Sequence, residues 1–132
     1  MSDGVLPRIL VVDDDPNAVA DFIDMLGDSA DCAGVYSSDE ALAAVNSTSF
    51  DLVLLDYHLG DGVSGEGILK YMREREIATP VIMISKNADF RTVRKAWHGG
   101  ADDFLGKTPT RSELRDAVER CLDRALVLRA NE

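Results

Sequence analysis

Two short apolar runs that end in carboxylates constrain the fold of this chain more than any other feature. Residues 52–55 read Leu-Val-Leu-Leu and lead directly into Asp56, and residues 9–12 read Ile-Leu-Val-Val and lead into three aspartates at 13–15. Such short apolar runs are typical of strands covered on both faces, as in a parallel sheet. In open α/β sheets, ligands bind beyond the carboxyl ends of the strands. The two runs therefore predict a cluster of carboxylates at one sheet edge, where a hard divalent cation would offset their repulsion.

The rest of the chain alternates strand and helix patterns. Strands are expected at residues 9–12, 32–36, 51–55, 80–84 and 103–105. Helices are expected after each strand, with apolar residues at helical spacing in 19–26, 41–45, 68–72, 90–97 and 114–125. Crossovers between parallel strands are right-handed, and each strand needs cover on both faces. Five β/α units therefore predict an α/β fold with one doubly wound parallel sheet between two layers of helices.

Several helix boundaries carry start signals. Asp15 followed by proline predicts an N-cap and a first helical residue, and capping boxes begin at Ser37 and Thr110. Helical spacing places Trp97 in the inward stripe of its helix, which favours a core position over a partner contact. Residues 73–76 are expected to be solvated.

Length and composition bound the class of protein. The 132 residues fit a single domain, and 45% hydrophobic with 29% charged residues is ordinary for a globular chain. A net charge of −10 argues against direct nucleic-acid binding. No apolar stretch approaches the roughly 18 residues that span a bilayer, and no secretory pattern is present, so a cytoplasmic protein without membrane contact is expected. Cys32 and Cys121 lack metal-ligand spacing and are expected to be small hydrophobic residues.

The residues at the predicted strand ends indicate a particular chemistry. Asp13 and Asp14 follow the first strand, Asp56 the third, Ser85 the fourth and Lys107 the fifth. A carboxylate can act as nucleophile toward a phosphoryl group. Magnesium held by neighbouring carboxylates neutralises charge on phosphoryl oxygens, and a lysine and a hydroxyl can pair with the remaining oxygens. This set of groups predicts phosphoryl transfer.

Four segments of the chain resemble the response-regulator receiver domain of two-component signalling. They are residues 9–16, 51–56, 80–85 and 100–107, and their order and spacing match the family. The resemblance covers residues 8–124 and implies a flavodoxin-like sheet with strand order 2-1-3-4-5. Residues 1–132 are expected to form one receiver domain, in which 125–132 extend the last helix.

By this resemblance Asp56 is the phosphoacceptor, which takes a phosphoryl group from a histidine of a sensor kinase or phosphotransfer protein. Asp14, Asp56 and the backbone carbonyl of His58 are implied as Mg²⁺ ligands, with Asp13 acting through water and Mn²⁺ as a substitute ion. The side chain of His58 is expected beside the site, where it affects access. No enzyme activity is expected beyond self-phosphorylation from small phosphodonors and autodephosphorylation.

The resemblance also implies a switch. Lys107 would bind the phosphoryl group, Ser85 would swing to hydrogen-bond it, and Phe104 would turn inward behind it. This coupled motion would alter the surface of the fourth helix, fifth strand and fifth helix, which could contact a second copy or an output domain. Residues 126–128 are apolar on more than one side of the last helix and suggest the same two partners.

The sequence departs from the family pattern in two loops. Gly60 stands where proline is usual, and the loop that ends at Gly65 is one residue longer than the commonest form, so this loop is expected to be looser. Thr108 separates Lys107 from Pro109, whereas the family usually has proline there in a cis bond. Because a cis bond before threonine would cost roughly 2.5–4 kcal/mol, a different path is expected for this turn.

Lys86 is a third departure, at a position that usually holds a small residue. Its ammonium group either leans over the site, where it would pair with the phosphoryl group or block an attacking water, or it is simply solvated. The sequence leaves both interpretations open.

Two other functions share parts of this pattern. A magnesium-dependent phosphohydrolase would use Asp56 as nucleophile, but it generally has a second aspartate two residues later, where this chain has His58, and an inserted cap segment, which this chain lacks. A nucleotide-binding flavodoxin-like module would need a phosphate loop after the first strand, and residues 13–16 would repel phosphate unless a metal intervened.

Overall fold

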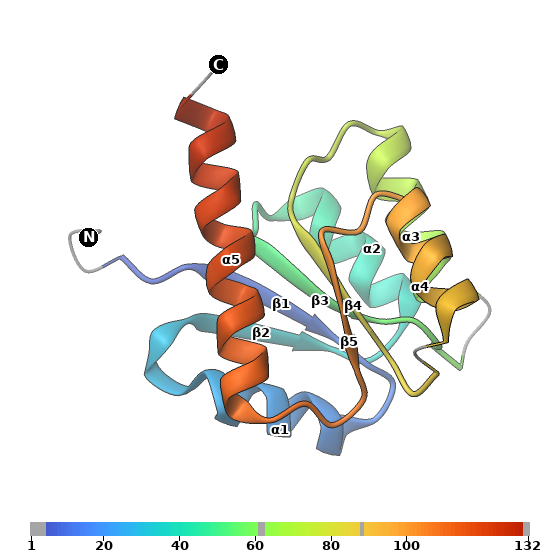
Figure 1. The fold of residues 1–132 in the computed structure, drawn as a ribbon, viewed down its shortest axis with the longest axis horizontal. Helices are drawn as coiled ribbons and strands as arrows, with labels where there is room; N and C mark the ends of the chain where they lie inside the picture. Colours follow the sequence, from blue (N-terminus) through green and yellow to red (C-terminus); the bar gives the residue numbers. More distant parts are fainter. Residues whose placement is uncertain (1–4, 61–62, 88, 131–132) are drawn as a thin grey trace.

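The computed structural model describes residues 5–60, 63–87 and 89–130, and the outermost residues of the predicted domain lie outside this part. The elements in chain order are β1 (Arg8–Val12), α1 (Pro16–Leu26), η1 (Gly27–Ser29), β2 (Asp31–Val35), α2 (Ser38–Ser47), β3 (Leu52–Asp56), α3 (Gly65–Glu74), β4 (Val81–Ser85), α4 (Phe90–His98), β5 (Asp103–Gly106) and α5 (Arg111–Ala130). All neighbouring strands are parallel, in the order β2-β1-β3-β4-β5 (Figure 1). The predicted fold class and strand order are confirmed.

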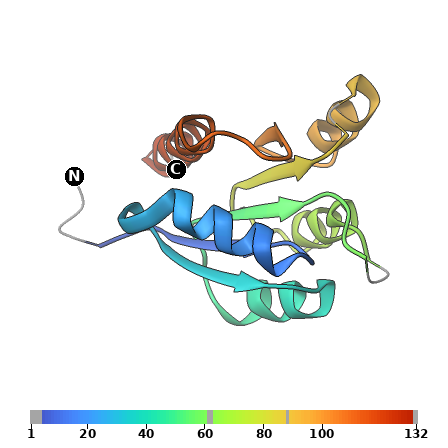
Figure 2. The same cartoon turned by 90° about the horizontal axis from the view of Figure 1, so that it is seen from below.

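Two hydrophobic cores lie on opposite faces of the sheet. Side chains alternate between the faces of a strand, so Ile9 and Val11 pack with α1 and α5, whereas Leu10 and Val12 pack with α2, α3 and α4. Figure 2 shows the sheet between these two layers of helices. β3 is buried along its whole length, as its apolar run predicted. The first and third strands are therefore held rigidly, and so are the carboxylates at their ends.

The predicted helix starts are present. The Asp15 carboxylate accepts a hydrogen bond of 2.9 Å from the amide of Asn17, and the Ser37 hydroxyl accepts one of 3.1 Å from the amide of Glu40. At α5 the box is reciprocal, because Glu113 donates its amide to the Thr110 hydroxyl and accepts from the Thr110 amide. Side-chain oxygens thus satisfy amides that have no partner inside the helix.

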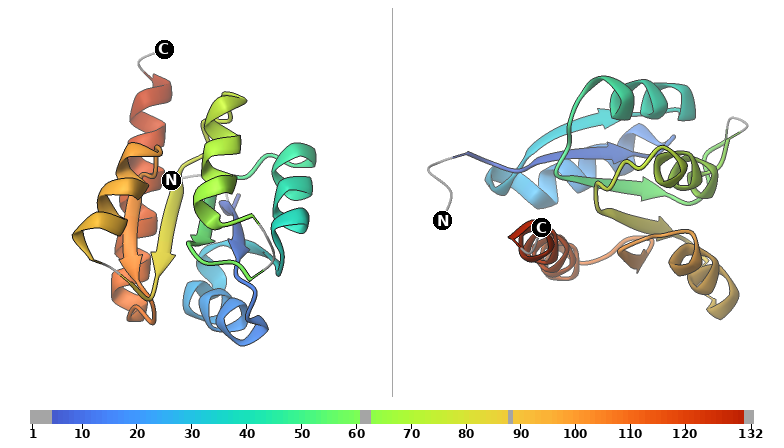
Figure 3. Two further views of the ribbon diagram at one scale, coloured as in Figure 1. Left: turned by 90° about the vertical axis from the view of Figure 1, so that its right-hand side faces the viewer. Right: turned by 90° about the horizontal axis from the view of Figure 1, so that it is seen from above.

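The prediction that Trp97 lies in the core is wrong. Trp97 is 48% exposed and Phe90 is 79% exposed, and only Ala96 of α4 is buried. α4 packs beside β5, the edge strand of the sheet, so one flank of the helix has no neighbouring helix layer to cover it (Figure 3). Helical spacing identifies a face, but it does not reveal that the covering layer ends there.

The prediction that Arg73 is solvated is also wrong, although residues 74–76 are exposed. The guanidinium of Arg73 donates to the carbonyls of Gly100, Ile77 and Thr79 and forms an ion pair of 3.1 Å with Asp102. A guanidinium carries five N–H donors in a fixed plane, which suits it to satisfy several loop carbonyls at once. Arg73 therefore ties the end of α3 to the loops before β4 and β5.

The two cysteines behave largely as expected. Cys121 is 2% exposed in the α5 core, and burial raises the pKa of its thiol to about 11. Cys32 is partly buried on β2, and burial raises the pKa of its thiol as well. A thiol with a raised pKa carries little thiolate and is unreactive.

The C-terminal part of α5 projects beyond the sheet (Figure 1). Leu126, Val127 and Leu128 on this part are each about 60% exposed, as the sequence suggested. Among the described residues, no helix combines the length and the apolar character needed to cross a membrane.

Candidate functional site

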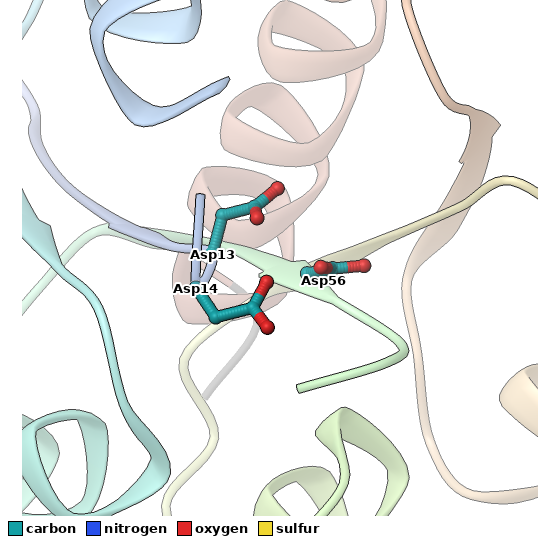
Figure 4. A group of neighbouring side chains, drawn as sticks. All are labelled: Asp13, Asp14 and Asp56. Atoms are coloured by element: carbon teal, nitrogen blue, oxygen red, sulfur yellow. The ribbon is translucent and has the colours of Figure 1, made fainter. Parts of the chain in front are cut away.

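Three carboxylates converge at the carboxyl ends of β1 and β3. One oxygen from each of Asp13, Asp14 and Asp56 lies within 4.8 Å of the other two, and Figure 4 shows the three side chains around one space. Asp13 is 1% exposed and Asp56 is 5% exposed, whereas Asp14 faces solvent. The predicted carboxylate cluster is present, and its open side is at Asp14.

Lys107 closes the cluster from the end of β5. Its ammonium nitrogen lies 2.6 Å from Oδ2 of Asp13 and 3.4 Å from Oδ2 of Asp56. Burial alone would lower the pKa of Lys107, but hydrogen bonds and charge from Asp13 and Asp56 outweigh this effect and raise its pKa. Lys107 is therefore a fixed positive charge in the site at neutral pH.

The carboxyl group of Asp56 is electrostatically unfavourable in this setting. Burial raises the pKa of Asp56, the charge of Asp13 raises it further, and Lys107 and the His58 amide only partly oppose this. A second cation close to these oxygens would relieve the repulsion. Hard divalent cations prefer oxygen ligands of this kind, so the three carboxylates fit a magnesium-sized ion.

Backbone amides hold the three carboxylates in place. The Asp15 amide donates to Oδ1 of Asp13 at 3.0 Å, and the His58 amide donates to Oδ1 of Asp56 at 3.3 Å. The Gly60 amide donates to Oδ2 of Asp14 at 3.1 Å. These contacts leave other carboxylate oxygens available to a ligand.

Two glycines between the end of β3 and the start of α3 allow the backbone to approach the site closely. A Cβ atom at Gly60 would lie 2.9 Å from Oδ2 of Asp14, and one at Gly65 would lie 2.1 Å from the backbone oxygen of Asp56. The sequence predicted only looseness at Gly60 and did not predict its contact with Asp14. The glycine-rich composition of the loop was the available signal, but it does not identify the partner.

Ser85 lies at the end of β4, as predicted, and is completely buried. Its hydroxyl oxygen accepts a hydrogen bond of 3.1 Å from the amide of Asn87, a residue that the sequence did not single out. Phe104 lies on β5 opposite Met83 and packs, half-buried, against the core beneath α2, α3 and α4. Ser85 therefore ends β4, and Phe104 lies on the strand that pairs with β4.

Two basic side chains near the site are exposed. The ring of His58 packs edge-on against Tyr57, with centroids 4.9 Å apart, and Tyr57 in turn donates a hydrogen bond to Glu66 of α3. Lys86 forms no hydrogen bond or ion pair with the rest of the described chain. Its position therefore does not distinguish an ammonium group that leans over the site from one that is simply solvated.

The turn after Lys107 takes the different path that was expected. The Lys107–Thr108 peptide bond is trans, and Thr108 has φ of 58°, in the left-handed region. This conformation is uncommon for a β-branched residue. The Thr108 hydroxyl donates to the Lys107 carbonyl at 2.5 Å, which fixes the backbone immediately after the lysine.

A doubly wound sheet with carboxylates, a hydroxyl and a lysine at its carboxyl edge is an arrangement suited to binding a phosphoryl group. The family model described as the response regulator receiver domain matches residues 9–119. The chain therefore belongs to the response regulator receiver domain family. Members of this family are phosphorylation-activated switches of two-component signalling rather than conventional enzymes, and the comparisons do not support a phosphohydrolase.

Individual relatives agree with this family. The chain is 35% identical over 121 residues to the transcriptional regulatory protein CiaR of Streptococcus pneumoniae, covering 89% of this chain and 52% of CiaR. It is 33% identical over 110 residues to the cell cycle transcriptional regulator CtrA of Caulobacter vibrioides, covering 81% of this chain and 46% of CtrA. The chain thus spans about half the length of these relatives.

Solved structures agree as well. The signal receiver domain of a putative Luxo repressor protein from Vibrio parahaemolyticus superposes with a TM-score of 0.91 at 26% identity, covering 97% of this chain and 98% of that one. The similarity therefore extends over nearly all of both chains.

Proposed function

We propose that Asp56 is the phosphoacceptor of this receiver domain. A carboxylate oxygen of Asp56 would attack the phosphorus of a phosphohistidine on a sensor kinase or phosphotransfer protein. An O–P bond then forms, the P–N bond breaks, and the imidazole leaves with the electron pair. The observation that carries the proposal is the placement of Asp56 beside Lys107 and two further carboxylates at the carboxyl edge of the sheet.

Asp13, Asp14 and Asp56, with the backbone carbonyl of His58, would hold Mg²⁺, for which Mn²⁺ would substitute. The bound ion would neutralise charge on the phosphoryl oxygens. The same arrangement would accept phosphoryl groups from small donors such as acetyl phosphate and would release them slowly by hydrolysis. The raised pKa of Asp56 supports this proposal, because it reflects a buried negative charge that lacks sufficient compensation.

Lys107 and Ser85 would bind the transferred phosphoryl group. The ammonium of Lys107 already lies 3.4 Å from Asp56, so the group would be paired as soon as it arrives. The Ser85 hydroxyl would donate to a phosphoryl oxygen, and Phe104 would turn inward behind it. This motion would shift the surface formed by α4, β5 and α5 toward its active state.

We further propose that residues 1–132 form one receiver domain, with its core in residues 8–124 and residues 125–132 extending α5. A sensor histidine kinase is the partner that family membership implies, and the cytoplasm is the compartment we infer from it. A second copy or an output domain would contact the surface of α4, β5 and α5.

Acetyl phosphate tests the proposal. Incubation with acetyl phosphate and Mg²⁺ should add one base-labile phosphoryl group, measured by intact mass. The Asp56→Asn variant should add none, whereas Asp21→Asn, which removes an exposed carboxylate of α1, should react normally. A phosphoryl group that persists in Asp56→Asn would refute the assignment, and steady turnover of phosphate esters would favour a hydrolase.

A further inference from the structure

A cavity of about 620 Å³ lies at the amino ends of the strands, opposite the edge that carries the three carboxylates. Its lining comes from residues 45 and 48–50 before β3, residues 77–80 before β4, residue 102 before β5, and one side of α5 at residues 121, 124, 125 and 128. Figure 1 shows this distal half of α5 rising beside the connections that lead into the strands. The volume is in the range of pockets that enclose small organic molecules. The lining includes no residue of α4 and none of the carboxylate cluster.

The wall of the cavity combines apolar surface with a few hydroxyl groups. Phe50 and Ile77 lie at the margin of the core beneath α2, α3 and α4 and are only partly buried. On the α5 side of the same cavity, Leu128 is 60% exposed. A molecule in the cavity would remove these apolar surfaces from water, which is favourable. Three hydroxyl side chains complete the wall: Thr48, Ser49 and Thr79.

Two charged side chains line the cavity, and only one of them is balanced. Asp102 forms an ion pair of 3.1 Å with Arg73 and accepts a hydrogen bond of 2.9 Å from the amide of Val81. Arg124 is exposed and forms no ion pair or hydrogen bond with the residues that the structure describes. The cavity therefore presents one uncompensated positive charge beside apolar surface, in a chain whose net charge is −10.

We propose that this cavity binds a small organic acid whose apolar body carries one carboxylate. The body would lie against the apolar wall, and the guanidinium of Arg124 would pair with the carboxylate. A guanidinium matches a carboxylate with two parallel hydrogen bonds, and the nearby hydroxyls can donate to its other lone pairs. Charge complementarity selects an anion, because the acidic residue of the lining, Asp102, already has a partner. Binding does not involve Asp56, so the proposal stands or falls separately from the proposed function.

Three probes that share one apolar body test the proposal on the unphosphorylated protein. They are the anion 4-phenylbutyrate, the neutral 4-phenylbutyramide and the cation 4-phenylbutylammonium. Amide chemical shifts in proton–nitrogen correlation spectra report both the affinity and the location of binding. The anion should bind with saturation and more tightly than the amide, and the cation should bind most weakly. The shifts should concentrate at residues 48–50, 77–79 and 121–128 and should spare residues 13–14 and 56–58.

Variants separate the charged contact from the apolar one. Arg124→Gln should weaken binding of 4-phenylbutyrate by about fivefold and leave binding of the amide unchanged, because only the charged contact is lost. Leu128→Ala should weaken binding of both by about threefold, because the apolar contact is common to them. Arg111→Gln makes the same charge change at the other end of α5 and should leave binding unchanged within about twofold. All three side chains are exposed, and circular dichroism confirms that each variant is folded.

Four results would overturn the proposal. Binding of 4-phenylbutyrate that does not saturate up to about 10 mM would mean that the cavity has no specific affinity for it. Equal binding of the anion and the cation, or equal loss in Arg124→Gln and Arg111→Gln, would remove charge complementarity as the cause. Shifts centred on α4 or on the carboxylate cluster would place the site elsewhere. Shifts at the cavity that depend on protein concentration alone would make a second copy the occupant.

Discussion

Asp56 occupies a position where a buried negative charge is only partly balanced. Lys107 is shared between Asp13 and Asp56, and the shorter distance, 2.6 Å, is to Asp13. Burial and repulsion by Asp13 therefore still destabilise the ionised carboxylate of Asp56, and its pKa is raised for this reason. A bound cation or phosphorylation would relieve this destabilisation, because each changes the charge at the oxygens of the Asp56 carboxylate itself.

The raised pKa predicts that Asp56→Asn stabilises the protein in the presence of EDTA. The unfolded carboxyl ionises near its usual pKa of 3.8, and the folded one ionises only at higher pH. Between the pKa of the unfolded state and that of the folded state, the folded protein binds more protons than the unfolded chain. The free energy of unfolding therefore falls as pH rises through this window, and it stays lowered at neutral pH. The variant removes the penalty, so its free energy of unfolding at pH 7, measured by urea unfolding, should be higher than that of the natural protein.

The pH dependence supplies the control for this prediction. The difference between Asp56→Asn and the natural protein should be small near pH 4 and should widen toward pH 7. A variant that is less stable at pH 7, or a difference that does not change with pH, would contradict the proposed electrostatic cause.

Lys86 directly follows Ser85, and its side chain forms no hydrogen bond or ion pair with the residues that the structure describes. If its ammonium pairs with the phosphoryl group or blocks the attacking water, Lys86→Ala should shorten the lifetime of phosphorylated Asp56 by several-fold. The lifetime is followed by release of phosphate after removal of acetyl phosphate. Lys70→Ala, at an exposed lysine on α3, should leave the lifetime unchanged, and an unchanged lifetime in Lys86→Ala itself would leave the solvated interpretation.

At the scale of single residues, the sequence predicted which groups meet but not how they bond. Parallel strands end at one edge, so Asp13, Asp56 and Lys107 had to converge there. The preference of Lys107 for Asp13 and the contact of Gly60 with Asp14 depend on ångström-scale backbone paths. Residue order does not contain such distances.

At the scale of elements, a chain of hydrogen bonds connects the site to α4. The Ser85 hydroxyl accepts from the Asn87 amide at 3.1 Å, and the Asn87 side chain accepts from the Asp89 amide at 3.3 Å. The Asp89 carboxylate then accepts from the Thr92 amide at 2.8 Å, inside the first turn of α4. A change in the Ser85 hydroxyl therefore has a continuous physical connection to the start of the helix.

This chain predicts that Asn87 couples the site to α4. Beryllofluoride, an analogue of the phosphoryl group, should change Trp97 fluorescence in the natural protein in the presence of Mg²⁺. Asn87→Ala should reduce this change by about half or more, while acetyl phosphate still modifies Asp56.

A matched asparagine tests whether the effect is local. Asn46 on α2 donates to the Leu42 carbonyl and to the Tyr71 hydroxyl, away from the site. Asn46→Ala should keep the full fluorescence change. An equal response in Asn87→Ala and the natural protein would show that α4 senses the site by another route.

The elements themselves were well predicted, because their signals are local. The N-cap at Asp15 and the capping boxes at Ser37 and Thr110 satisfy helix amides within a few residues. The exposure of Trp97 and the burial of Arg73 were not predicted, because they depend on where the sheet ends and on carbonyls from distant loops. Periodicity identifies an apolar face but not the extent of its cover.

At the scale of the whole molecule, charge is separated along the sheet. Residues 9–69 carry 13 acidic residues without a lysine or arginine, and they include all three carboxylates of the site. Like charges at this density destabilise the compact state, and salt screens the repulsion. Sodium chloride should therefore raise the midpoint of urea unfolding by a general effect that does not depend on any one carboxylate.

Magnesium should add a second, site-specific effect to this general one. A ligand that binds only the folded state stabilises it by RT ln(1 + [L]/Kd), which is about 1.4 kcal/mol at ten times Kd. At constant ionic strength, Mg²⁺ should therefore stabilise the natural protein beyond what sodium chloride achieves.

Two variants with the same change of charge separate the effects. Asp14→Asn removes a carboxylate of the site, so it should abolish the magnesium-specific gain but keep the response to sodium chloride. Asp21→Asn removes an exposed carboxylate of α1, which belongs to the acidic part of the chain but not to the cluster, and should keep both responses. Equal magnesium responses in the two variants would mean that the ion binds diffusely to the acidic surface, and the carboxylate cluster would then not be a metal site.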